Sequence, residues 1–314
     1  MRCRSIFIDE RAAGRRADVF LSLRFTSISR TAFAQHIKAG LVTRTVRELK
    51  PSSILFSGDV LQIFVPGLAP TTPEPAMPEV LYEDDRILVV NKPAGMLVHP
   101  AGDKFAWGLI GVVKRARPDD KIDLVHRLDR ETSGVLVMTK DRKTNVFLKQ
   151  VFFEHRVEKV YMAIVRGQVP WKHQEIQAPV GLAISSDIRL RRGVNPEGRP
   201  AHTTVKTLQV MDETTLVSCQ IHTGRTHQIR VHMEHVGFPL LGDKIYGQPD
   251  RIFIEYLERG INDALRTHLR FPRHALHSSS LAFPHPDGHQ VTVQAPLTDD
   301  MNAVVNGASP AWLV

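Results

Sequence analysis

The chain contains, at residues 126–134, the polar segment His126-Arg127-Leu128-Asp129-Arg130-Glu131-Thr132-Ser133-Gly134. The apolar run that follows, up to Thr139, predicts a buried strand, so this segment forms a charged loop beside the core. Arg127 and Arg130 flank Asp129 and favour its ionised form. An ionised aspartate can act as a nucleophile or base, and it is a poor general acid at neutral pH. The spacing alone favours another interpretation, a structural network of salt bridges in which Thr132 or Ser133 caps a turn.

A second polar segment reads Thr223-Gly224-Arg225-Thr226-His227-Gln228-Ile229-Arg230-Val231-His232. If a helix begins near Thr226, His227 and Arg230 project from one face because they are three residues apart. Gln228 then lies off that face. The pattern indicates either a binding site or an ordinary polar helix face, and the spacing does not decide between them.

Metal and cofactor motifs are missing from the sequence. The four histidines His222, His227, His232 and His235 are five, five and three residues apart, which does not repeat the i, i+4 pair of a helical zinc site. We therefore expect no metal. The chain has no glycine-rich phosphate loop, no dinucleotide-binding fingerprint and no Cys-x-x-Cys pair, so we also expect no cofactor.

Strand patterns outnumber helix patterns and do not alternate with them. Strands are predicted at residues 86–90, 134–139, 159–165, 203–210, 216–222 and 289–293, and helices at 145–153, 226–236 and 252–257. This order indicates an α+β fold with a mixed, largely antiparallel sheet and flanking helices, rather than a doubly wound fold. Tyr161 lies in one of these strands among apolar residues, where an ordinary core tyrosine is the usual finding.

Composition limits the class of protein. The 314 residues are 42% apolar, which excludes a disordered chain, and they are enough for two domains because single cores stop growing near ~250–300 residues. No apolar run approaches the roughly 18 residues of a membrane span, and the first residues lack the apolar part of a secretory signal. Two cysteines, Cys3 and Cys219, cannot build a disulfide framework. We expect a globular protein of the cytoplasm.

Most of the excess positive charge lies in the first 65 residues. They carry 11 Lys and Arg against 5 Asp and Glu, a net of +6, whereas the remaining residues carry a net of +2. Such a basic head favours a polyanionic partner such as nucleic acid, although a merely solvated basic surface is the alternative. Five prolines between residues 66 and 78 cannot form a hydrogen-bonded ladder and predict a linker. We therefore expect a head at 1–65, a linker at 66–78 and a body at 79–314.

The head itself has the patterns of a small α/β domain. Ser29 is a candidate cap for a helix over residues 31–39 that ends at Gly40, with Phe33 and Ile37 on one face. An amphipathic segment at 17–23 precedes it, and a strand at 60–65 follows.

Segment 126–134 resembles the signature of the RluA-type pseudouridine synthases, which isomerise uridines in ribosomal or transfer RNA. Four further stretches resemble motifs of that family in the same order: residues 91–95 with His99-Pro100, 159–163, 224–232 with Gly242-Asp243, and 274–277 with 283–286. The resemblance extends from about residue 79 to residue 296. It implies the pseudouridine synthase fold with a central RNA-binding cleft. It also implies an isomerase that needs no cofactor, since one bond breaks and re-forms within the same nucleotide.

The head resembles the RNA-binding module first described in small-subunit ribosomal protein four. The matching positions are Arg16, Asp18, Phe20, Leu21, Ser29, Arg30, Ile37, Gly40, Val42, Gly58 and Asp59. It departs from that module where an Asn-Gly turn usually follows the valine, because residues 43–47 here are Thr-Arg-Thr-Val-Arg.

The resemblance implies roles for individual residues. Asp129 would be the catalytic carboxylate, and Arg230 would pair with it and hold its orientation. Tyr161 would pack against the uracil ring and assist proton removal from carbon five, and Arg127 would fill the gap left by the flipped nucleotide. The other RNA contacts expected are His126, Arg225 and His227 in the body, and Arg16, Ser29, Arg30, Lys38 and Arg44 in the head.

Other functions remain open from the sequence. A non-catalytic RNA-binding or ribosome-assembly protein on the same fold would have no need of Asp129, Tyr161 and Arg230 together. A hydrolytic glycosidase would need a second positioned acid, for which Glu131 is the nearby candidate. Within the family, the appended head and linker favour large-subunit ribosomal RNA over transfer RNA as the substrate. We expect the chain to act as a monomer.

Overall fold

A computed structural model describes residues 4–10, 12–25, 28–44, 48–64, 75–98, 108–186 and 188–308. The chain divides into two compact units, one from residues 1–77 with 99–112 and one from residues 78–98 with 113–314. Residues 66–74 of the predicted linker, the pair His99-Pro100 and Cys3 lie outside the described residues. The boundaries expected for head, linker and body stay predictions.

The smaller unit contains a three-stranded antiparallel sheet and two helices. Its elements are β1 (Arg4–Phe7), α1 (Ala17–Arg24), α2 (Arg30–Lys38), β2 (Val42–Arg44) and β3 (Val60–Ile63), with the strands in the order β1-β3-β2. The helix α2 begins after Ser29, whose hydroxyl accepts a hydrogen bond of 3.2 Å from the amide of Ala32, as the capping pattern predicts. Phe33 and Ile37 on this helix are buried in the core of the unit.

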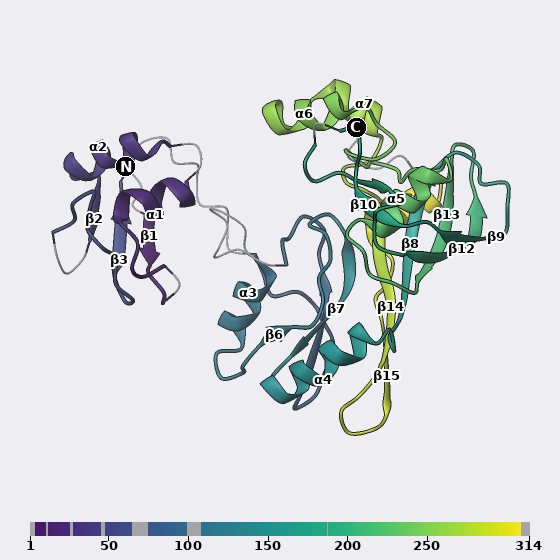
Figure 1. Ribbon diagram of the computed structural model, residues 1–314, viewed down its shortest axis with the longest axis horizontal. Helices are drawn as coiled ribbons and strands as arrows, with labels where there is room; N and C mark the ends of the chain where they lie inside the picture. Colours follow the sequence, from purple (N-terminus) through teal and green to yellow (C-terminus); the bar gives the residue numbers. More distant parts are fainter. Residues whose placement is uncertain are drawn as a thin grey trace. The chain divides into compact units, whose positions relative to one another are not determined.

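The larger unit is built on one large sheet (Figure 1). The elements from residue 80 onward are β4 (Val80–Glu83), β5 (Ile87–Lys92), α3 (Leu109–Ala116), β6 (Asp123–Leu124), β7 (Ser133–Thr139), α4 (Arg142–Phe153), β8 (Glu158–Arg166), β9 (His173–Gln177), β10 (Val180–Leu182), β11 (Arg192–Val194), β12 (His202–Val210), β13 (Thr214–Ile221), α5 (Gln228–His235), α6 (Asp250–Arg259), α7 (Asp263–Leu269), β14 (Leu276–Pro284), β15 (Gln290–Gln294) and α8 (Asp299–Val305). The division between the two units falls within α3.

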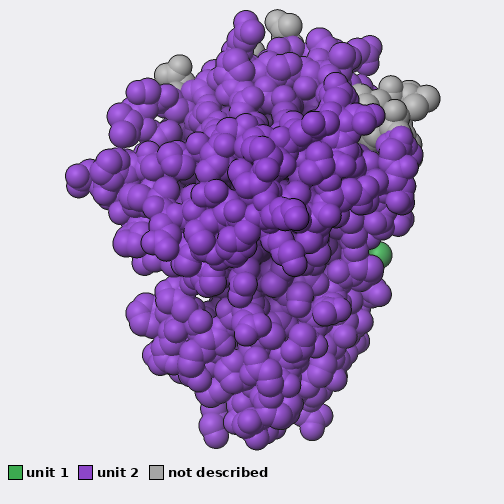
Figure 2. All heavy atoms as spheres, turned by 90° about the vertical axis from the view of Figure 1, so that its right-hand side faces the viewer, with its two compact units in different colours: residues 1–77, 99–112 green, residues 78–98, 113–314 purple. Residues whose placement is uncertain are grey.

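The strand order of the large sheet is β4-β5-β7-β14-β8-β13-β12-β9, with β15 added to β14 and β6 added to β7. Among the described strands, the β7–β14 pair is parallel and the other pairs are antiparallel. The α+β class with a mixed, largely antiparallel sheet is therefore confirmed. Figure 2 shows the heavy atoms of one side of this unit in purple.

The parallel contact at the centre depends on a glycine. Gly134 at the start of β7 has φ +106°, and a Cβ placed there would lie 2.1 Å from the carbonyl oxygen of Ser278 on β14. No larger residue fits this approach without moving the backbone. Next to it, Ser133 Oγ lies 2.9 Å from His277 Nδ1, and Thr132 Oγ1 lies 2.8 Å from His274 Nε2. These contacts tie the end of segment 126–134 to the middle of the sheet.

Each half of the sheet has its own core. In one half, α4 packs its Leu148 and Val151 against Val135 and Val137 of β7. In the other half, Ile164 of β8 packs with Leu241, Phe271 and Ala275. No helix in the described parts of the chain is long and apolar enough to cross a membrane.

Most predicted strands and helices are confirmed, with shifted ends. Strand β5 continues to Lys92, two residues past the end predicted from its apolar run. Helix α5 begins at Gln228 rather than at Thr226, because His227 adopts a left-handed backbone with φ 60°. The elements that were not predicted are β1, β2, β4, β6, β9, β10, β11, β14, α3, α7 and α8. Most of them have too few residues for a clear periodicity. The central strand β14 has nine residues, but the polar run His277-Ser278-Ser279-Ser280 interrupts its apolar pattern.

Candidate active site

Asp129 lies in the loop before β7, with its side chain 29% exposed. Its Oδ2 is 3.2 Å from Nη1 of Arg230 on α5 and 3.7 Å from Nε2 of His227. The neighbours in sequence are not its partners, which corrects the expectation that Arg127 and Arg130 provide the positive charge. Arg130 instead donates to the hydroxyl of Tyr256 at 2.8 Å. The charge beside Asp129 therefore comes from a residue 101 positions away.

Arg230 is buried and is held by a second aspartate. Its Nε and Nη2 donate to Asp243 at 2.6 and 2.9 Å, a two-pronged ion pair, while Nη1 reaches Asp129. Asp243 is fully buried and also accepts the backbone amides of Ile245 and Tyr246. Although burial disfavours ionisation, the adjacent guanidinium holds the pKa of Asp243 well below its ordinary value. In the sequence, Asp243 belongs to a motif that resembles the family's, and no residue near it indicates this role.

His227 faces Asp129 as a neutral ring. Burial, with the nearby charge of Arg230, lowers the pKa of His227 to about 4. The hydroxyl of Tyr246 accepts the amide of Arg192 at 2.9 Å and lies 2.8 Å from Nδ1 of His227. That hydroxyl has one proton to donate, and Nδ1 is the acceptor within reach, so the ring proton is assigned to Nε2, the atom that faces Asp129.

Gln228 has a structural role that its position in the sequence did not reveal. Its Oε1 accepts the hydroxyl of Thr223 at 2.7 Å and the amide of Arg225 at 3.0 Å. Its Nε2 donates to the carbonyl of His202 and to the hydroxyl of Thr203. With all four contacts made, Gln228 fixes the turn that leads into α5 and so the positions of His227 and Arg230.

Tyr161 is on β8 and is buried, with 7% of its surface exposed. Burial, with the negative charge of Asp129 as a smaller cause, raises the pKa of Tyr161 to about 12. The phenol is therefore protonated at neutral pH. It can pack against a ring or donate a hydrogen bond, but a protonated phenol is not a base.

Lys92, the last residue of β5, holds the loop that contains Asp129. Its ammonium donates to the carbonyls of Pro93, Met96 and Arg130 at 2.9, 2.9 and 3.1 Å. Burial, with the positive charge of Arg273, lowers its pKa to about 7. Three carbonyl acceptors match the three donors of an ammonium, so this geometry suits the charged form. In the sequence, Lys92 stands out only as part of the motif at residues 91–95, and nothing in its neighbours indicates this contact.

The other predicted site residues of the body lie in different surroundings. Arg127 is exposed. His126 makes internal contacts, because its ring stacks on Phe152 at 4.9 Å and its Nε2 accepts the amide of Val137. Burial lowers the pKa of His126 to about 3, which agrees with its acceptor role. Arg225 is partly exposed beside α5.

In the smaller unit, two of the predicted RNA-binding arginines share one carboxylate. Arg16 and Arg30 both contact Asp18, at 3.0 Å each. Arg44 pairs with Asp59 at 3.1 Å. Lys38, at the end of α2, is exposed.

One group with metal-ligand side chains exists among the described residues, and it shares only His222 with the four histidines considered in the sequence. Glu175, His202 and His222 have ligand atoms within 4.8 Å of one another. Their polar atoms already bond with each other and with Thr204, which accounts for the cluster without an ion. The expectation that the protein uses no metal stays a prediction.

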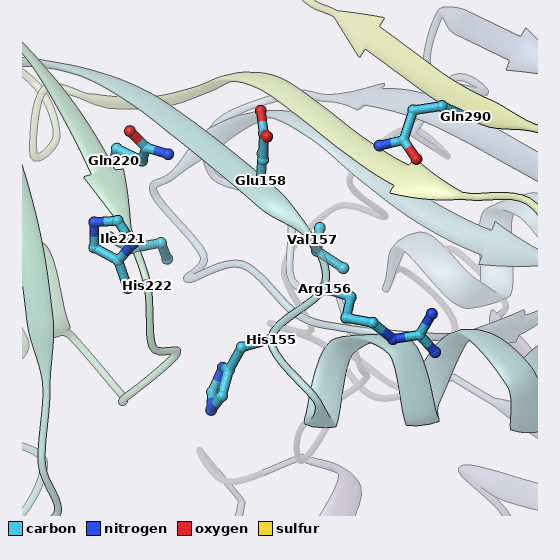
Figure 3. Close-up of a pocket in the computed structure, with 8 residues that line it drawn as sticks. All are labelled: His155, Arg156, Val157, Glu158, Gln220, Ile221, His222 and Gln290. Carbon is cyan, nitrogen blue, oxygen red and sulfur yellow. The ribbon is translucent and has the colours of Figure 1, made fainter.

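A cavity of about 380 Å³ lies where β8 begins and β13 ends (Figure 3). His155, Glu158, Gln220 and His222 are among the residues that line it, and Asp129 is not. The central RNA-binding cleft expected from the family resemblance therefore stays a prediction.

Comparison with known proteins decides the family. Residues 86–235 match the family described as RNA pseudouridylate synthase. A Vibrio vulnificus protein named ribosomal large subunit pseudouridine synthase C is 34% identical, over 95% of this chain and 94% of that protein. The protein of the same name from Escherichia coli O157:H7 is 36% identical, over 92% of this chain and 91% of that protein. This chain belongs to the RluA-type pseudouridine synthases.

The fold agrees with that assignment. The structure of human RNA pseudouridylate synthase domain containing 4 aligns with a TM-score of 0.57 at 23% identity, over 72% of this chain and 91% of that chain. The chain is accordingly an RNA isomerase, as the motif resemblance predicts. The roles of Asp129, Tyr161 and Arg230 and the RNA-binding module in the head stay predictions.

Proposed function

We propose that this synthase converts specific uridines of large-subunit ribosomal RNA to pseudouridine, with Asp129 as the catalytic carboxylate. One observation carries the proposal: Asp129 is partly exposed to solvent and has its Oδ2 3.2 Å from Arg230 and 3.7 Å from His227. A carboxylate held by two partners while one side remains open is suited to attack a substrate. The names of the relatives support large-subunit ribosomal RNA as the substrate.

The reaction moves one bond within a nucleotide. Asp129 attacks the ribose or the base and forms a bond to it, and the bond from ribose carbon one to uracil nitrogen one breaks. The uracil turns and bonds to ribose carbon one through carbon five, and the bond to Asp129 breaks, which regenerates the carboxylate. Arg230 orients the carboxylate, since Asp243 prevents the guanidinium from turning away. Neutral His227 contributes an Nε2–H on the same side.

Carbon five must lose its proton for aromaticity to return. The resemblance assigned help in this step to Tyr161, but its pKa of about 12 leaves it protonated. We therefore assign the removal of this proton to the regenerated Asp129 carboxylate, directly or through water, and the proton ends on uracil nitrogen one. Tyr161 keeps its role as the packing surface for the uracil ring. The target base has to leave its stack first, at a cost of a few kcal/mol, and exposed Arg127 is positioned in the same loop to fill the gap.

Mapping the modified positions tests the substrate. Pseudouridines are mapped in total RNA from cells with and without the gene, and from cells that carry the gene with Asp129→Asn. One or a few sites in large-subunit ribosomal RNA should disappear without the gene and stay absent with the variant. Loss of sites only in transfer RNA would contradict the ribosomal assignment.

We also propose that the basic head binds RNA and that the protein acts as a monomer in the cytoplasm. The net charge of +6 over residues 1–65 supports the binding of RNA by the head. Ion pairs with Asp18 and Asp59 partly neutralise Arg16, Arg30 and Arg44, and this leaves exposed Lys38 as a cation without such a pair among the described residues.

Deleting residues 1–65 should weaken RNA binding and flatten its dependence on salt. Each lost phosphate contact reduces the slope of log affinity against log salt by about 0.7–0.9. The dissociation constant is measured for both proteins between low and moderate salt with the same ribosomal RNA fragment. An unchanged slope would count against the docking role of the head.

A further inference from the structure

Lys159 lies in the larger unit, two residues before Tyr161 on β8. Because side chains alternate along a strand, the two project from the same face. Lys159 is 93% buried, since only 7% of its surface is exposed. Within the described chain its ammonium has no hydrogen bond and no ion pair. It lies beside the turn before α5, where a Cβ on Gly224 would be 3.9 Å from its Nζ.

Arg225 belongs to that same turn and offers unused donors. Its Nε donates to the carbonyl of Pro200 at 2.9 Å, and its backbone amide donates to Gln228. The bond from Nε holds the side chain just before its terminal nitrogens, and the bond from the amide holds the backbone. The terminal nitrogens have no partner among the described residues, so the flat fork of the guanidinium remains free to bind an anion.

The charged groups around Lys159 and Arg225 are positive and have no negative partner among the described residues. The pKa of Lys159 is lowered by burial and by the charge of Arg225, and that of Arg225 by burial and by the charge of Arg199. His155 is affected in the same direction, by burial and then by Lys159. No carboxylate in the described chain forms a salt bridge with Lys159 or Arg225.

The nearest acid in sequence does not compensate this charge. Glu158 precedes Lys159 on β8 and projects to the opposite face, where it lines the cavity with Gln220 (Figure 3). Like charges left together without a counter-charge destabilise a fold. An arrangement that costs stability is typical of a site whose ligand supplies the missing charge.

We propose that Lys159 and Arg225 form a subsite for one backbone phosphate of the RNA, next to the target uridine. This inference rests on the proposed function. A lysine supplies a point charge and an arginine a two-pronged donor, which together suit a phosphate. Two residues along a strand span about 7 Å. The subsite therefore lies close to Tyr161, within reach of the nucleotide that holds the uracil or of its neighbour.

The test uses an RNA hairpin that carries the mapped uridine, and versions of it in which one phosphate at a time is replaced by a neutral methylphosphonate. With the full-length wild type, one linkage near the uridine should weaken binding about tenfold when it is neutral. With Lys159→Gln, binding to the natural hairpin should be about tenfold weaker, and neutralising that same linkage should have no further effect. Lys159→Arg should keep most of the affinity because it keeps the charge.

A matched control removes an exposed lysine from the same sheet. Lys206→Gln on β12 should bind like the wild type and respond to the neutral linkage in the same way. The subsite is refuted if, for every linkage tested, neutralising that linkage weakens the binding of Lys159→Gln as much as it weakens the binding of the wild type.

Thermal unfolding separates a binding role from a structural one. Lys159→Gln should unfold at the same temperature as the wild type or at a higher one in low salt, because it relieves repulsion. A lower unfolding temperature together with a loss of affinity at every linkage would indicate a structural role and overturn the proposal.

The two proposals fail in different ways. If the wild type modifies no RNA, the proposed function fails, and inorganic pyrophosphate then serves as the probe of the subsite. It should raise the unfolding temperature of the wild type and of Lys206→Gln more than that of Lys159→Gln. Equal shifts for all three proteins would refute the subsite independently of the RNA.

Discussion

Replacing Asp129 with Asn should reduce the rate of pseudouridine formation by at least ~10⁴-fold, the scale on which enzymes respond to loss of a nucleophile. The amide keeps the shape of the carboxylate but removes its charge and its nucleophilicity. Arg230 retains its two bonds to Asp243, so the surroundings of residue 129 should persist. The rate is measured in single-turnover reactions with saturating enzyme and the RNA substrate identified by mapping.

An exposed aspartate of the same unit provides the control. Asp119→Asn removes one negative charge at the surface and should leave the rate within about twofold of the wild type. Unfolding midpoints of both variants should stay within a few degrees of the wild type. If Asp129→Asn retains more than a tenth of the wild-type rate, Asp129 is not the catalytic carboxylate.

Replacing Asp243 with Asn should lower the free energy of unfolding by about 3–5 kcal/mol, the usual cost of breaking a buried ion pair from one side. Asp243 is fully buried, and Arg230 would remain buried with only partly exposed Asp129 to balance its charge. The loss is measured by denaturant unfolding at neutral pH. Activity should fall as well, since Arg230 is then free to turn away from Asp129.

The effect of pH on this variant has a definite sign. The folded pKa of Asp243 lies below the ordinary value, so its stabilisation is complete above about pH 4 and is lost as the pH falls toward the folded pKa. The difference in stability between wild type and Asp243→Asn should therefore be constant from about pH 5 to 7 and shrink below about pH 4.

The matched control is Glu213→Gln, which breaks the exposed ion pair with Arg270. Both side chains of that pair face solvent, and its loss should cost less than about 1 kcal/mol. If Asp243→Asn and Glu213→Gln lower the free energy of unfolding by the same amount, the ion pair between Arg230 and Asp243 does not stabilise the fold.

The sequence could predict features that depend on neighbouring residues. Alternating and continuous apolar runs indicated most strands of the large sheet, and Ser29 indicated the start of α2, because strand burial and helix capping act over a few residues. Family motifs, rather than spacing, singled out Asp129, Tyr161 and Arg230. From spacing alone, a network of salt bridges was the favoured interpretation of the loop that contains Asp129.

The partners of those residues depend on the tertiary structure. Asp129 takes its positive charge from Arg230, 101 residues away, and not from Arg127 or Arg130 beside it, since the β7–β14 contact and the turn held by Gln228 set which side chains meet. Asp243 is recognised as the anchor of Arg230 only by its burial against it.

The role proposed for Lys159 also depends on the tertiary structure. In the sequence it is one lysine of a strand. In the fold it is buried next to Arg225 without a counter-charge, a situation that depends on where the turn before α5 lies. Local sequence patterns thus determined most strands of the large sheet and the family of this protein. Long-range packing decided which charged side chains are paired within the fold and which remain to bind a substrate.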